Sequence, residues 1–91
     1  MTIYLAICEW AMENASGVTT EAFYTPEKAR EKINQWIEEE KNESWIGAFD
    51  ENGILFDEYI INSGVDYWSI WEKNNYNNSY ANISIRKLEV K

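Results

Sequence analysis

The chain has 91 residues, which is enough for one compact domain spanning residues 1–91 and too few for two. Its 16 Asp and Glu residues outnumber its 8 Lys and Arg residues, and the formal charge of −8 argues against direct binding to nucleic acid or to an anionic membrane. It has no histidine and one cysteine, Cys8, which excludes histidine-based catalysis and metal ligation, an internal disulfide and a cysteine-based zinc site.

The first 24 residues are predicted to hold two strands. Residues 3–10 alternate with apolar side chains on both faces, which is typical of an interior strand. Residues 18–24 are rich in β-branched and aromatic side chains, which favours a second strand. With residues 11–17 as their connection, the two strands are expected to form a β-hairpin.

A helix is predicted from about Pro26 to Lys41. Thr25 has the side chain of an N-cap, and Pro26 stands at the first helical position, where its missing N–H leaves no hydrogen bond unmade. Apolar side chains then recur at i, i+4, i+7 and i+8, as is typical of a helix that lies on a sheet. This apolar stripe consists of Ala29, Ile33, Trp36 and Ile37.

A second hairpin is predicted directly after the helix. Residues 44–50 and 54–61 flank Asn52-Gly53, a pair that is favoured where a turn requires positive φ. A calcium-binding loop at this turn is rejected, because Ala48 and Tyr59 would stand at two of its ligand positions.

A third hairpin is predicted from residues 67–73 and 81–91, joined by the Asn-rich residues 74–79. The apolar positions change parity within the last strand, so we expect a β-bulge near Arg86. The expected fold is therefore α+β, with one helix packed on a mostly antiparallel sheet and the element order ββαββββ.

The negative charge is concentrated in the middle of the chain. Residues 42–72 contain seven acids and no Lys or Arg, so a hairpin in this region is expected to present a negative field. One interpretation is that these acids only keep a small protein soluble. The other is that carboxylates on strands and turns imitate nucleic-acid phosphates and compete for a basic groove on another protein. The acids assigned to such a surface are Asp50, Glu51, Asp57, Glu58 and Asp66.

Two aromatic residues are candidate anchors for a partner. If Trp68 and Ile70 point into the core, the alternation of the strand leaves Tyr67 and Trp71 on the outer face. Exposed Trp and Tyr side chains are frequent anchors of protein interfaces and can also stack on a nucleobase. The alternative is that loops of the same chain cover this face.

The opening strand TIYLAICEW, the strand that runs into TPEKAREKI, and the closing strands YWSIWE and ISIRKLEVK give the chain its overall pattern. In architecture and composition the whole chain resembles small acidic accessory proteins of phages and mobile elements, which include anti-CRISPR and other anti-defence inhibitors. The resemblance implies a stoichiometric inhibitor of a host nucleic-acid-processing complex that acts without a cofactor.

We therefore expect a non-enzymatic inhibitor that binds the basic surface of a bacterial anti-phage defence effector. The sequence contains no stretch of 18 apolar residues and no basic signal-peptide region, so we expect a cytoplasmic protein, in the cytosol of the host cell, that does not contact membrane. We expect no cofactor and no metal. The alternative is a module, formed at a homodimer interface, that binds a small molecule or a nucleotide signal in an aromatic pocket. Its phosphate-binding residues would be Lys73, Arg86, Lys87 and Lys91.

Overall fold

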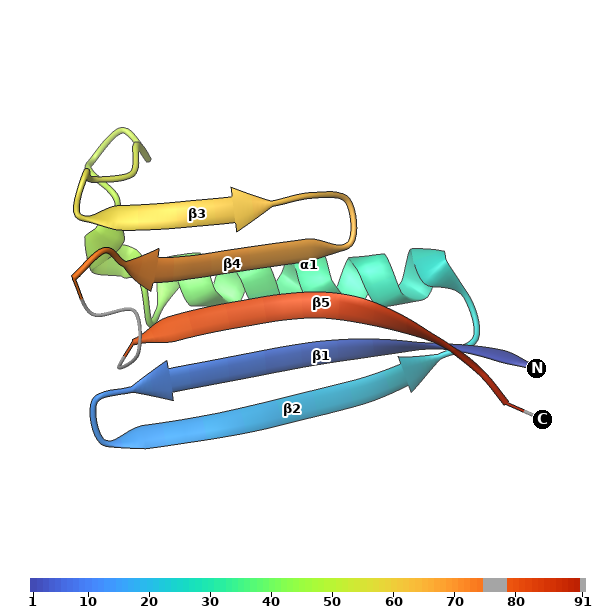
Figure 1. The fold of residues 1–91 in the computed structure, drawn as a ribbon. Helices are drawn as coiled ribbons and strands as arrows, with labels where there is room; N and C mark the ends of the chain where they lie inside the picture. The colour runs from blue at the N-terminus through green and yellow to red at the C-terminus, as the bar shows by residue number, and fades with distance from the viewer. Residues whose placement is uncertain (75–78, 91) are drawn as a thin grey trace.

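The computed structural model describes residues 1–74 and 79–90, and in these ranges one α-helix lies across one face of a five-stranded antiparallel sheet (Figure 1). The strand order is β2-β1-β5-β4-β3, so β2 and β3 form the edges. The predicted α+β class is confirmed. In chain order the elements are β1 (Thr2–Met12), β2 (Ala15–Phe23), α1 (Pro26–Asn42), the 3-10 helix η1 (Ile46–Ala48), β3 (Tyr59–Ser63), β4 (Tyr67–Glu72) and β5 (Tyr80–Glu89).

The first two strands form the predicted hairpin, with a shorter link than expected. Met12 pairs with Ala15, so β2 begins at Ala15 rather than at residue 18. The pairing continues through Gly17, where a Cβ atom would come within 2.8 Å of the Trp10 indole nitrogen. Gly17 therefore acts as a strand residue that leaves room for the Trp10 ring. The predicted interior position of β1 is also confirmed, because β5 pairs with its other side.

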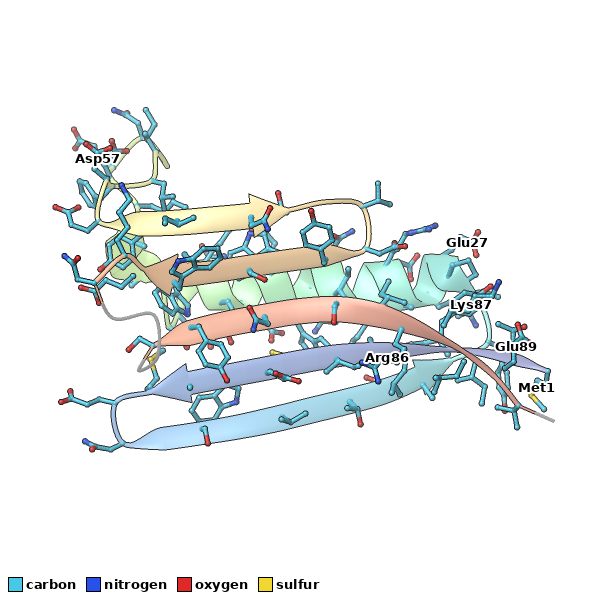
Figure 2. All side chains as sticks on the ribbon, viewed as in Figure 1. Met1, Glu27, Asp57, Arg86, Lys87 and Glu89 are labelled. Carbon is cyan, nitrogen blue, oxygen red and sulfur yellow. The ribbon has the colours of Figure 1, made fainter. Side chains whose placement is uncertain are left out.

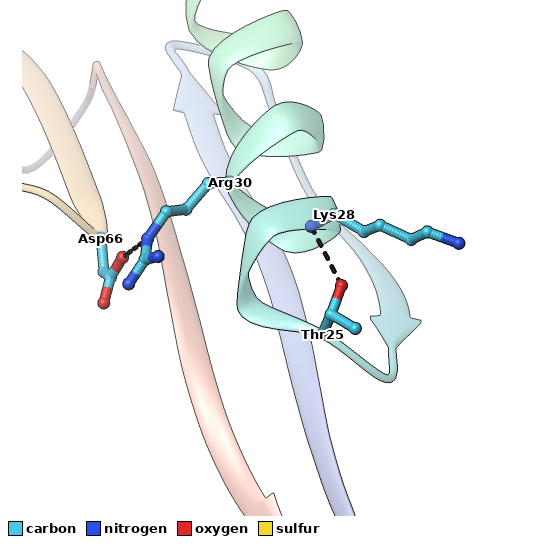
Figure 3. Close-up of polar contacts among 4 residues, drawn as sticks. All are labelled: Thr25, Lys28, Arg30 and Asp66. Carbon is cyan, nitrogen blue, oxygen red and sulfur yellow. Dashed lines mark hydrogen bonds and ion pairs between the residues drawn. The ribbon is translucent and has the colours of Figure 1, made fainter.

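The helix begins where the sequence predicts. The Thr25 hydroxyl oxygen accepts a hydrogen bond from the Lys28 backbone N–H at 3.3 Å and caps the first turn (Figure 3). Ala29 and Ile33 are buried against the sheet, and the rest of the apolar stripe packs beside them. The sheet contributes alternate residues to this core, which are Ala6, Cys8, Trp68, Ile70, Ala81 and Ile83.

We call the opposite face of the sheet the open face, because no helix or strand of residues 1–74 and 79–90 lies over it (Figure 1). The β1 side chains that alternate with the core residues lie on this face, and Leu5 and Ile7 are half-buried there between β2 and β5.

The prediction of a strand at residues 44–50 is wrong, and in residues 1–74 and 79–90 three strands rather than four follow the helix. Trp45 and Ala48 are both buried, and the turn of η1 places residues three apart on the same side. Trp45 packs edge-on against Tyr59, with ring centroids 6.0 Å apart. What remains of the expected pairing is a single bridge between Phe49 and Leu55. The Asn52-Gly53 turn is confirmed, with φ of +78° at Gly53.

The predicted bulge near Arg86 is also wrong. The register between β1 and β5 is continuous from Thr2–Glu89 to Ala11–Tyr80. The apolar residues shift from odd to even positions of β5 because they lie on different faces of the sheet. Ile83 faces the helix, whereas Leu88 lies on the open face, opposite Ile3. The predicted Asn-rich loop falls largely on residues 75–78, outside the described residues.

Candidate acidic interface

The acidic candidates at residues 50–58 lie on one loop. We call residues 49–58, between η1 and β3, the acidic loop; it stands beside edge strand β3, and Figure 2 labels Asp57 on it. Its base is tied to the fold by two backbone hydrogen bonds. Phe56 N–H donates to the Ala48 carbonyl at 2.9 Å, and Lys73 N–H donates to the Glu58 carbonyl at 2.9 Å.

Asp50 stabilises the acidic loop through hydrogen bonds within the loop. Its carboxylate oxygen Oδ1 accepts hydrogen bonds from the backbone N–H groups of Asn52, at 2.8 Å, and Ile54, at 2.9 Å. The Asp50 N–H in turn donates to the Ile54 carbonyl at 2.8 Å. Such bonds are typical of aspartate in a turn. Asp50 therefore stabilises the loop conformation and has less freedom to meet a partner.

The other three acids of the loop are available at the surface. Glu51, Asp57 and Glu58 are exposed, and in the described part of the chain none of them has an ion-pair partner. The loop also holds exposed Ile54 and Phe56 side chains. Charged and apolar groups are thus presented together, as protein interfaces require.

A pocket of about 430 Å³ lies between the acidic loop and the C-terminal turns of α1. Three carboxylates and one ammonium group line it, and the C-terminal end of the helix adds a negative partial charge. The arrangement suits a cationic side chain. The lining residues are Glu38, Lys41, Asn42, Ile46, Phe49, Asp50, Glu51 and Gly53. The sequence does not identify Glu38 as a site residue, because no residue near it in the chain indicates that the end of α1 lies beside the acidic loop.

Asp66 does not belong to the same surface. It follows β3 at its far end, and five strand residues separate it from the acidic loop, a span of about 17 Å. Its Oδ1 accepts a hydrogen bond from Arg30 Nε at 2.8 Å (Figure 3), and this contact raises the pKa of Arg30. The sequence predicts an unpaired negative charge at Asp66. In the structure its carboxylate instead forms an ion pair with Arg30 of α1.

The two aromatic candidates lie on the open face, as the strand alternation predicts. Trp68 and Ile70 are buried against the helix, which places Tyr67 and Trp71 on the other side of β4. Tyr67 is 44% exposed and lies at the Asp66 end of the strand. Trp71 is half-buried between Ile60 and Tyr80 in the register, at the end nearer the acidic loop.

A second pocket, of about 240 Å³, is lined by Trp10, Met12, Glu40 and Ser44. Burial raises the pKa of Glu40, and burial raises the pKa of the nearby Cys8 thiol to about 11. Cys8 is therefore a protonated core residue at neutral pH. Among the lining residues that the structure describes, Trp10 alone is aromatic, so within residues 1–74 and 79–90 this pocket does not gather the Trp and Tyr side chains that an aromatic ligand pocket would need.

The basic residues considered for phosphate binding are not gathered either. Lys73 is bound through its backbone N–H to Glu58, beside the acidic loop. Arg86 and Lys87 pair with Leu5 and Tyr4, near the other end of the sheet (Figure 2). Lys91 lies outside the described residues.

Comparisons with family models, curated proteins and solved structures find no match to this chain. Within residues 1–74 and 79–90, no helix combines the length and apolarity needed to cross a bilayer. In the same ranges, no group of three or more Cys, Asp and Glu side chains is placed to hold a metal ion.

Proposed function

We propose that this protein is a non-enzymatic inhibitor that binds another protein through the acidic loop and the adjoining end of α1. The partner we propose is a bacterial anti-phage defence effector, of CRISPR type or another nucleic-acid-processing type, whose basic groove the carboxylates occupy in place of nucleic acid. The observation that carries the proposal is the exposure of Glu51, Asp57 and Glu58, without ion-pair partners among the described residues, on one anchored loop.

Binding of this kind makes and breaks no covalent bond. A cluster of exposed carboxylates attracts a positively charged groove over about one Debye length, which is about 8 Å at physiological salt, and thereby raises the association rate. The pocket beside Glu38 then offers a place where a Lys or Arg side chain of the partner leaves water and meets several carboxylates. The exposed Phe56 and the half-buried Trp71 supply apolar contact area at the same end of the molecule.

The geometry divides the candidate acids into two groups. Asp50 and Asp66 hold the fold through the hydrogen bonds described above. Glu51, Asp57 and Glu58, joined by Glu38, form the proposed contact surface. A change of charge at the second group is therefore expected to affect binding much more than stability.

The proposal is tested by affinity capture from a lysate of a bacterium that carries such defence systems. The wild-type protein is compared with the double variant Asp57→Lys/Glu58→Lys and with the control Glu13→Lys/Glu31→Lys, which changes two exposed acids elsewhere by the same charge. We expect a nucleic-acid-binding effector to be retained by the wild type and the control, to be released by raised salt, and to be lost with the loop variant. Equal retention by all three proteins would refute the acidic loop as the binding surface.

A further inference from the structure

The outer edge of β2 is long and regular, and it pairs with no other strand of the described residues. Among the described strands, β2 pairs only with β1, through nine consecutive residue pairs without a bulge. Natural sheets protect their edges with short strands, Lys, Pro or bulges. The other edge strand, β3, has five residues, whereas β2 has nine and contains no Lys and no Pro. Its outward N–H and C=O groups are a template for another strand.

The charge of the chain limits what a second copy of the protein could contact. At a net charge of −8 two copies repel each other, so self-association requires a surface that carries little charge. In β2 the sole charged residue is Glu21, and its carboxylate lies 3.5 Å from Lys32 Nζ of α1. The exposed acids of the acidic loop are at β3, on the opposite edge of the sheet.

We propose that the β2 edges of two copies pair in antiparallel fashion about Thr19 and form a symmetric dimer with a continuous ten-stranded sheet. The register in which all nine residues of β2 overlap places Thr19 opposite the partner's Thr19. Val18, which is 64% exposed, then faces the partner's Thr20, a β-branched pair that favours strand association. Glu21 faces the partner's Gly17.

This register also keeps like charges apart. The two Glu21 residues lie four positions apart along the paired strands, about 13 Å, which exceeds the Debye length of about 8 Å at physiological salt. A register centred on Glu21 itself would place the two carboxylates directly opposite each other. A two-fold axis perpendicular to the sheet puts both helices on one side, and the two acidic loops lie at the far ends of the dimer. The proposed dimer forms through β2, and the acidic loop, on the opposite edge of the sheet, takes no part in it.

The test measures the mass of the protein in solution by sedimentation equilibrium over a wide concentration range. We expect a dimer whose dissociation constant rises several-fold with Thr19→Lys, because two ammonium groups would then stand directly opposite. The control Asn62→Lys makes the same charge change at an exposed position of β3 and should leave the dimer intact. A monomer at every concentration, or equal weakening by both variants, would overturn the proposal.

Disulfide formation gives a second readout of the same register. Opposed residues of an antiparallel pair have Cα atoms about 4.5–5.5 Å apart, within the range of about 4.4–6.8 Å that a disulfide requires. Because Thr19 also faces Cys8 within the β1–β2 hairpin, the test is made in a Cys8→Ala background, in which Thr19→Cys is expected to cross-link two copies rapidly on mild oxidation. Ala22→Cys, which would face the partner's Ser16, should not, and equal cross-linking of the two variants would contradict the register.

Discussion

Arg30 Nε donates a 2.8 Å hydrogen bond to Asp66 Oδ1, and this contact joins the first turns of α1 to the turn between β3 and β4 (Figure 3). The two residues are 36 positions apart in the chain. The contact explains why Asp66, although it lies in a stretch without Lys or Arg, adds little to the negative field of the protein.

If this pair contributes to stability, its two members should be coupled in a double-mutant cycle. We expect Arg30→Gln and Asp66→Asn each to lower the free energy of unfolding slightly, because both side chains are partly exposed and solvent screens their attraction. The double variant should lose less than the sum of the two. Urea unfolding at low salt measures all four proteins, and strictly additive losses would show that the contact is energetically silent.

The close approach of Trp10 to Gly17 predicts a large effect from a small substitution. Gly17→Ala would place a methyl group 2.8–2.9 Å from three atoms of the indole ring, so the ring must move. We expect a loss of about 1–3 kcal/mol in the free energy of unfolding, as for other overpacked sites. Gly47→Ala is the control, because apart from the adjoining residues and backbone of its own turn no atom lies within 4 Å of its Cβ position. Equal stability of the two variants would contradict the close contact between residue 17 and the Trp10 ring.

Because Asp50 stabilises the acidic loop through hydrogen bonds, two substitutions at this residue should differ in their effect on stability. Asp50→Asn keeps an oxygen that can accept from the N–H groups of Asn52 and Ile54, whereas Asp50→Ala removes both hydrogen bonds. We expect the alanine variant to lose about 1–2 kcal/mol and the asparagine variant to lose much less. Hydrogen exchange at the Asn52 and Ile54 amides reports the same difference locally. Similar behaviour of the two variants would mean that Asp50 acts through its charge rather than through these bonds.

The buried thiol of Cys8 predicts a dependence of stability on alkaline pH. Burial raises its pKa from an ordinary value of 9.0 to about 11, so the folded protein holds the proton more tightly than the unfolded chain. The contribution of the protonated Cys8 thiol to the free energy of unfolding is therefore fully present below about pH 9. It is lost as the pH rises toward 11. Urea unfolding at pH 8, 9 and 10, compared between the wild type and Cys8→Ala, should show a steeper decline for the wild type. If the free energy of unfolding fell equally with pH in the wild type and Cys8→Ala, the Cys8 thiol would be more exposed to solvent than the structure shows.

Local features of this chain were predictable because the groups that cause them are neighbours in sequence. Thr25 and Pro26 define the start of α1, and Asn52-Gly53 defines a turn with positive φ. The alternation around Trp68 correctly indicates which residues of β4 face the helix.

Contacts between distant segments were not predictable in this way. Trp45 and Ala48 are both buried in the core around η1, and the sequence of residues 44–50 alone, which predicts a strand, does not reveal these contacts. Leu88 lies opposite Ile3 on the open face. From the sequence alone, the change in the apolar pattern at this position wrongly indicates a bulge. For the candidate site, the exposed acids of the acidic loop were identified, whereas Glu38 was missed because the packing of α1 brings it there.

In the proposed function the acidic loop takes the place of nucleic acid on its partner. The most direct measurement is competition: a labelled nucleic acid bound to the captured effector is titrated with this protein. We expect stoichiometric displacement by the wild type, weaker displacement at raised salt, and none by Asp57→Lys/Glu58→Lys. A ternary complex in which nucleic acid and this protein are bound together, unaffected by the loop substitutions, would contradict it.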